Sequence, residues 1–278
     1  MSKSRKPALF QVLGELSGSR KLIGSLAKND FKTKFAGSYL GRVWAFVQPV
    51  VTVFVYWFVF EKALNAGTQS TKQGIPVPYV LWLVAGLVPW FYFSDAMSAG
   101  TNALLEYDYL VKKVVFRIST LPVVKVVSSL FVHIFFVCFM MILYVGYGLF
   151  PGVYAVQLVY YSFCMFVFVM AVSYLTSALA VFFRDLVQMI NILLQVQIWA
   201  TPIMWNMEAV SFPSPVLMIL KLNPMYYIVC GYRDSLINHI WFFQRPQLTL
   251  YFWCLTLFLL FAGTHVFRKL QPHFADVL

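Results

Sequence analysis

The strongest constraint on this chain is a series of apolar stretches, each long enough to cross a lipid bilayer as a helix. About 20 apolar residues cross the hydrocarbon core, where every backbone polar group must be hydrogen-bonded internally. The stretches are continuous rather than alternating with polar residues, which favours helices over a barrel. We therefore predict an all-α integral membrane protein with six transmembrane helices, near residues 43–62, 79–99, 121–149, 154–182, 186–205 and 247–267.

Composition and charge support a membrane protein and argue against other classes. The chain is 61% hydrophobic and 11% charged, whereas soluble domains are about 45–50% apolar and about 25% charged. The net charge of +11 comes from basic residues that flank apolar spans, so we expect no nucleic-acid partner. The four cysteines and four histidines are widely spaced, which predicts packing residues and no metal site.

The distribution of basic residues predicts the topology. Most of the 21 Lys and Arg residues fall on the cytoplasmic side if both termini are cytoplasmic, as the positive-inside rule requires. We therefore expect a multi-pass protein of the plasma membrane with both termini inside. Residues 1–42 would form a cytoplasmic N-terminal segment, and residues 43–278 a six-helix transmembrane domain.

Two segments outside the spans have a predicted structure of their own. Residues 21–36 place basic residues on one side and apolar residues on the other, which predicts an amphipathic helix in the cytoplasmic membrane interface. The alternative is a simple positive topology anchor. Residues 206–240 are apolar but broken by prolines, which predicts short re-entrant helices before the last span.

The sequence carries no sign of ATP hydrolysis. No Gly is followed by Lys, so a phosphate-binding loop is absent and we predict a transport subunit rather than an enzyme, without a cofactor of its own. Glu106 and Asp108 leave a membrane glycosyltransferase as a remote alternative. A proton-coupled flippase relying on Asp95 is another, although the sequence reveals no partner for this carboxyl group.

Two spans carry uncharged polar and aromatic residues at helical spacing. Such faces suit sugars, because hydroxyls need hydrogen-bonding partners and sugar C–H faces pack on rings. Polar groups facing lipid are costly, so both faces point at protein or water; helix–helix hydrogen bonding is the alternative. The first face comprises Trp44, Gln48, Thr52 and Tyr56, and the second Gln188, Asn191, Gln195 and Trp199.

Short segments spread over nearly the whole chain point to one family. They lie at residues 37–44, 56–60, 85–91, 182–185, 201–203 and 223–227. In this order they resemble the ABC-2 type permease subunits of ATP-binding-cassette exporters of surface glycopolymers. Residues 78–83 and 226–233 make the likeness closest to wall teichoic acid export permeases. O-antigen permeases share the broader pattern, so export of O-antigen or another lipid-linked polysaccharide is the alternative.

The resemblance implies partners and a path. It implies a homodimer with two copies of a separate ATPase subunit, which would hold ATP and Mg²⁺. An undecaprenyl-diphosphate-linked wall teichoic acid would enter between the first and fifth helices and thread a channel at the dimer centre. The two polar faces lie on those helices, and residues 206–240 would form an outer gate.

The resemblance also implies roles for residues on the cytoplasmic side. ATPase contacts would map to the amphipathic segment and to two turns. Charge and position make four basic residues candidates to hold the lipid diphosphate. The turns comprise Glu106, Tyr107 and Asp108, and Phe183, Arg184 and Asp185; the basic candidates are Lys28, Lys32, Lys34 and Arg42.

Overall fold

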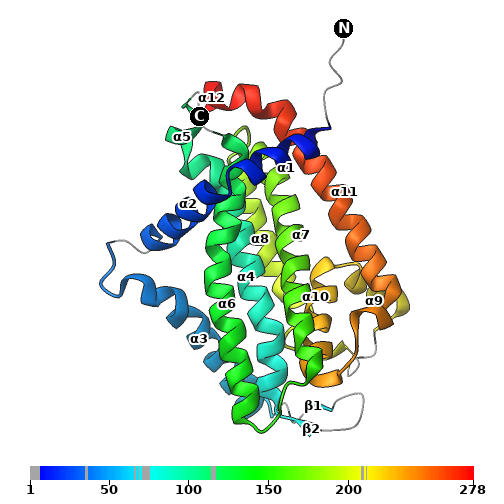
Figure 1. Cartoon of the computed structure of the whole chain (residues 1–278). Coiled ribbons are helices and arrows are strands. Elements are labelled where there is room, and N and C mark those ends of the chain that lie inside the picture. The colour runs from blue at the N-terminus through cyan, green and yellow to red at the C-terminus, as the bar shows by residue number, and fades with distance from the viewer. Residues whose placement is uncertain are drawn as a thin grey trace.

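The computed structural model describes residues 7–34, 37–65, 67, 69–70, 76–113, 117–207, 210 and 212–278. These residues are almost all helical (Figure 1), which confirms the all-α prediction. Two short strands, β1 (Gln69–Ser70) and β2 (Pro76–Val77), pair antiparallel between α3 and α4. The helices are α1 (Ala8–Gly18), α2 (Arg20–Thr33), α3 (Trp44–Trp57), α4 (Tyr79–Glu106), α5 (Asp108–Val111), α6 (Leu121–Gly146), α7 (Gln157–Ala180), α8 (Asp185–Ala200), α9 (Ser214–Lys221), α10 (Pro224–Arg233), α11 (Pro246–Leu270) and α12 (Phe274–Val277).

Among the described residues, five helical segments are long and apolar enough to cross a membrane: Gly41–Ala63, Tyr79–Glu106, Ile118–Gly146, Val153–Ala180 and Pro246–Val277. They coincide with five of the six predicted spans.

The remaining predicted span, 186–205, is shorter than expected. It corresponds to α8, which has 16 residues and ends at Ala200, a length of about 24 Å at 1.5 Å per residue. Thr201 leaves the helix in an extended conformation, because the residue before a proline is disfavoured in the helical region. The helix therefore ends at Ala200, directly before Thr201-Pro202 and five residues before the predicted boundary.

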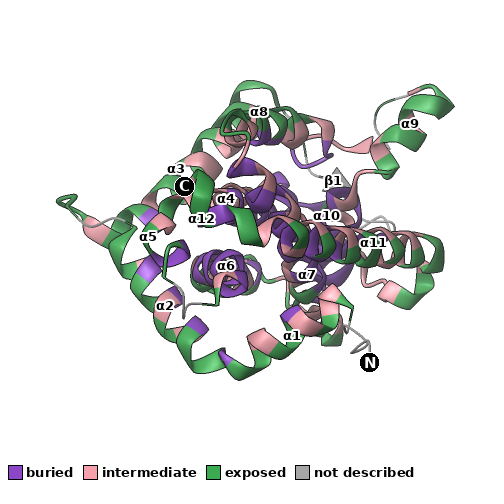
Figure 2. Cartoon of the chain, turned by 90° about the horizontal axis from the view of Figure 1, so that it is seen from above, coloured by how far each residue is buried: buried purple, intermediate pink, exposed green. Residues whose placement is uncertain are grey.

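Helix α4 lies at the centre of the bundle and is buried over most of its length (Figure 2). It packs against α6, α7, α8 and α10. Helix α3 is the opposite case, because Ala45 is its only buried residue and most of its apolar surface faces outward. In a bilayer such a surface faces lipid or another protein chain.

The N-terminal region differs from its prediction in two ways. A helix that the sequence analysis did not predict, α1, precedes α2. Helix α2 also buries Ile23, Ala27 and Asp30 and packs against α6, so it rests on protein as well as offering a basic outer side. Residues 1–6, 35 and 36 of the predicted segments lie outside the described residues.

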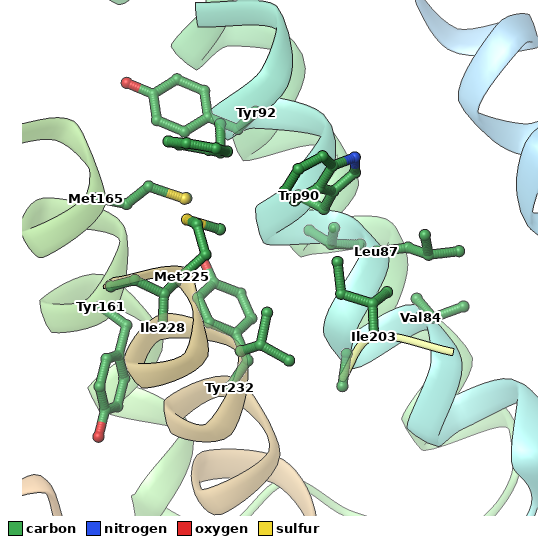
Figure 3. Packing of buried hydrophobic residues seen from close by; sticks show 14 of the residues in the cluster. Val84, Leu87, Trp90, Tyr92, Tyr161, Met165, Ile203, Met225, Ile228 and Tyr232 are labelled. Atoms are coloured by element: carbon green, nitrogen blue, oxygen red, sulfur yellow. The ribbon is translucent and has the colours of Figure 1, made fainter. Parts of the chain in front are cut away.

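Two short helices, α9 and α10, occupy the segment predicted to be re-entrant, of which residues 208, 209 and 211 lie outside the described residues. Figure 3 shows Met225, Ile228 and Tyr232 of α10 among buried residues of α4 and α7. The position of these helices relative to a membrane stays a prediction.

Arg233 at the end of α10 joins this region to the end of α8. Its guanidinium donates to the carbonyl oxygens of Pro202 (2.6 Å) and Ile203 (2.8 Å). It also lies 3.4 Å from the centroid of the Trp82 ring. Buried carbonyls outside a helix need such donors. The guanidinium therefore stabilises the backbone of the loop that directly follows α8.

Replacing Gly231 by Ala should destabilise the fold, because the new Cβ would lie 2.1 Å from the ring of the buried Tyr161. Overpacking of this kind costs about 1–3 kcal/mol, which thermal unfolding of the protein in detergent would detect. Gly146→Ala is the matched control, since nothing lies within 4 Å of its added Cβ. Equal melting temperatures for both variants would contradict the observed packing of α10 against α7.

Candidate functional site

A pocket of about 600 Å³ opens between α3, α4, α6 and α8. Its lining includes six of the eight residues predicted to face a substrate path, drawn from both polar faces. Two helices that lie far apart in the sequence therefore contribute to one site. The six residues are Trp44, Gln48 and Thr52 of α3 and Gln188, Asn191 and Gln195 of α8.

Helical spacing explains how each face reaches the pocket. Gln48 and Thr52 are one turn apart on α3, and the three polar residues of α8 follow the same three-to-four residue spacing. The Thr52 hydroxyl donates to the Gln48 carbonyl oxygen at 2.9 Å. On α8, Asn191 Oδ1 accepts a hydrogen bond from Ser98 of α4 at 3.0 Å, which joins the two helices at the pocket wall.

Two predicted members of these faces are not among the residues that line the pocket. Tyr56 is half-buried and packs against the hydrophobic core. Trp199 is exposed, and its carbonyl oxygen accepts from Trp205 Nε1 at 2.9 Å. The pocket therefore extends from Trp44 to Thr52 of α3 and from Gln188 to Gln195 of α8, but not over the last turn of α8.

The remaining polar wall comes from α4 and α6, which the sequence analysis did not assign to a site. Asp95 lines the pocket together with Ser98 and Ser129. Its carboxylate accepts from Lys34 Nζ at 2.5 Å and from Ser129 Oγ at 2.6 Å. These are the partners that were missing in the sequence, since Lys34 precedes Asp95 by 61 residues. A single acid within an apolar span indicates that the folded protein supplies a partner for it, although it does not identify that partner.

The four predicted headgroup residues separate in the structure. Lys34, the C-cap of α2, reaches into the pocket. Lys28 and Lys32 are exposed on α2, and Arg42 is exposed in the turn that begins the first span. Of these four residues, Lys34 alone lines the pocket.

A second cluster lies at the end of α4, where Glu106 and Tyr107 were predicted to contact an ATPase. The ammonium of the buried Lys125 donates to Asp30 Oδ1 at 2.6 Å and to Glu106 Oε2 at 2.5 Å. The Tyr107 hydroxyl donates to Asp30 at 2.7 Å. Burial and this bond to Asp30 raise the pKa of Tyr107, so it remains a donor. The network connects α2, α4 and α6.

The other predicted contact residues lie outside this network. Asp108 begins α5 and accepts from the Tyr109 amide at 2.6 Å. Phe183, Arg184 and Asp185 are exposed in the turn between α7 and α8, and Asp185 begins α8, where its charge suits the helix dipole.

Both turns lie at the end of the bundle that carries α1 and α12 (Figure 1). One apolar cluster there includes Leu104 of α4, Val181 after α7 and Phe274 of α12. The two turns therefore share one end of the molecule, where a single partner could contact both.

The carboxylates proposed for a glycosyltransferase are already engaged. Glu106 is bonded to Lys125 and Asp108 to a backbone amide. Among the described residues, no three His, Cys, Asp or Glu side chains gather where a metal ion could bind. A metal-bound sugar nucleotide would have to displace Lys125 from the network.

Comparison with known proteins adds family information. The model of the ABC-2 type transporter family matches residues 21–237. An O-antigen export system permease protein RfbA of Myxococcus xanthus is 28% identical, covering 96% of this chain and 99% of its own length. Two proteins of the same name from Klebsiella pneumoniae are 26% and 25% identical, each covering 92% of this chain and 95% of its own length.

Replacing Lys125 by Met should destabilise the protein by about 3 kcal/mol, because Asp30 would stay buried without its cation. The double variant Lys125→Met, Asp30→Asn should recover much of this loss, which thermal unfolding in detergent can measure. The exposed Lys21→Met provides a control on the same helix as Asp30. Additive effects of the two substitutions would contradict a coupled ion pair.

Proposed function

The chain belongs to the ABC-2 type transporter family, and we propose that it is the permease of an exporter for a lipid-linked polysaccharide of the O-antigen class. The family resemblance found in the sequence is thereby confirmed. The narrower teichoic acid interpretation is not supported, because the three relatives are O-antigen export permeases. These relatives support the interpretation that the sequence analysis left as the alternative.

The observation that carries this proposal is the pocket between the polar faces of α3 and α8. Gln48, Gln188 and Asn191 offer both donors and acceptors, which a glycan hydroxyl requires. The ring of Trp44 offers a surface for sugar C–H groups. The volume of about 600 Å³ is typical of small-molecule sites, so the pocket would hold the headgroup and first sugars rather than a long polymer.

A path for the remaining polymer would come from a second copy of the chain. Helix α3 is largely uncovered, and the exposed residues of α8 include Ile192, Leu193 and Val196. These apolar surfaces flank the pocket and would face either lipid or the second subunit. We therefore include in the proposal that the chain acts as a homodimer.

The driving force would come from a separate ATPase, present in two copies and binding ATP and Mg²⁺ itself. The exposed turn at Phe183 and the short helix α5 offer its contact surface on the cytoplasmic side of the plasma membrane. Motion at α5 would pass to α2 and α6 through Lys125 and its carboxylate partners. The permease itself needs only two conformations, and the nucleotide bound to the ATPase would shift the equilibrium between them.

Reconstitution tests the proposal directly. The chain is expected to co-purify with an ATP-binding-cassette ATPase, and lipid-linked O-polysaccharide should stimulate ATP hydrolysis in proteoliposomes. Export that continues without the ATPase, or that depends on a proton gradient, would contradict it. Sugar transfer by the purified chain with a divalent metal would favour the glycosyltransferase alternative instead.

Replacing both Gln48 and Asn191 by Leu should lower polysaccharide export about thirtyfold, because two hydrogen-bonding groups of the pocket would be lost at about 1 kcal/mol each. Basal ATP hydrolysis by the complex should persist. Leu193→Met, on the exposed side of α8, is the control and should export normally. Unchanged export by the double variant would remove the pocket from the transport path.

A further inference from the structure

Asp95 lies within the membrane-spanning helix α4 and is its only charged residue before Glu106, where the helix ends. A charge at such a position is costly and requires a partner. The structure supplies Lys34 and Ser129, and all three side chains line the pocket. The ion pair is only partly buried, since the accessible fraction is 36% for the Lys34 side chain and 39% for that of Asp95. A ligand in the pocket can therefore reach it.

Lys34 is the only Lys or Arg among the described residues that line this pocket. A phosphate group entering the pocket needs this ammonium as its counterion. In the structure, however, the ammonium is bonded to Asp95 at 2.5 Å. Any anion must therefore compete with the Asp95 carboxylate for Lys34. After its displacement the carboxylate would remain nearby and repel the anion.

The two phosphate chemistries of a bacterial membrane differ in their ability to compete. Both meet repulsion from Asp95, and a diphosphate, which carries more negative charge, meets more of it. A phospholipid brings one phosphodiester, so exchanging Asp95 for it only replaces one ion pair by another. A diphosphate has oxygen atoms on two phosphorus centres. It can accept from Lys34 while also accepting from hydroxyl and amide donors such as Ser98 and Gln48, which line the same pocket.

We propose that Asp95 is a specificity-determining residue that neutralises Lys34, so that bulk anionic phospholipid is rejected and a lipid-linked diphosphate is admitted. This inference rests on the proposed function and names the headgroup chemistry of the same site. Specificity of this kind is a difference between affinities and is achieved by a repulsive element against the abundant competitor. Without Asp95, an unpaired ammonium would attract any anionic lipid.

The test measures binding of a fluorescent isoprenyl diphosphate to the permease–ATPase complex in nanodiscs. One set of nanodiscs contains phosphatidylcholine alone, and the other is rich in phosphatidylglycerol. The wild-type Kd should differ by less than about twofold between them, whereas Asp95→Asn should bind about tenfold more weakly in phosphatidylglycerol. Asp276→Asn, an exposed acid on α12, is the matched control and should behave as wild type.

A second variant separates this role from simple packing. Lys34→Gln should weaken diphosphate binding about tenfold in both nanodiscs, whereas Lys269→Gln on the exposed end of α11 should not. Unchanged binding by Lys34→Gln would overturn the proposal. So would equal loss of affinity by Asp95→Asn in both lipids, which is the result expected if the pair only holds α2 against α4.

Two further arms identify the ligand and separate this inference from the proposed function. Inorganic diphosphate should compete weakly, and competition equal to that of the isoprenyl diphosphate would overturn the lipid assignment. A wild-type complex that shows the predicted lipid selectivity but no ATP-driven export would refute the proposed function alone. The opposite result would be normal ATP-driven export by the wild type together with an Asp95→Asn variant whose Kd is as insensitive to phosphatidylglycerol as that of the wild type. It would refute this inference alone.

Discussion

The buried ammonium of Lys125 holds together the parts of the protein that the proposed mechanism requires. It is bonded to Asp30 of α2 and to Glu106 at the end of α4, and it lies 4.8 Å from the centroid of the Tyr107 ring. A buried charge is tolerated only with such partners. Their positions are therefore mutually dependent, and the segment predicted to contact an ATPase cannot move independently of α2.

Helix α2 connects this network to the pocket over a single helical turn. Asp30 and Lys34 are four residues apart, so they lie on neighbouring turns of one face. Asp30 is bonded to Lys125 and Tyr107, and Lys34 is bonded to Asp95 in the pocket. Both Asp30 and Lys34 therefore bind charged residues of the transmembrane helices.

The features that could be predicted from the sequence are those that depend on neighbouring residues alone. Five spans and the polar faces of α3 and α8 could be predicted, because apolar length and helical spacing are local properties. The partner of Asp95 could not, since it lies 61 residues away and pairing over such a distance depends on tertiary structure. The short extent of α8 was foreseeable from Thr201-Pro202. The short segments could not distinguish teichoic acid from O-antigen as the exported polymer, because permeases for both share them.

Photo-crosslinking would test most directly whether lipid-linked polysaccharide occupies the pocket between α3 and α8. A photoreactive phenylalanine analogue would replace Gln188 in the pocket, and in a control would replace Phe258 on the exposed surface of α11. The account predicts adducts of lipid-linked polysaccharide at position 188 and none above background at position 258. Adducts at position 258 with none at position 188 would contradict it.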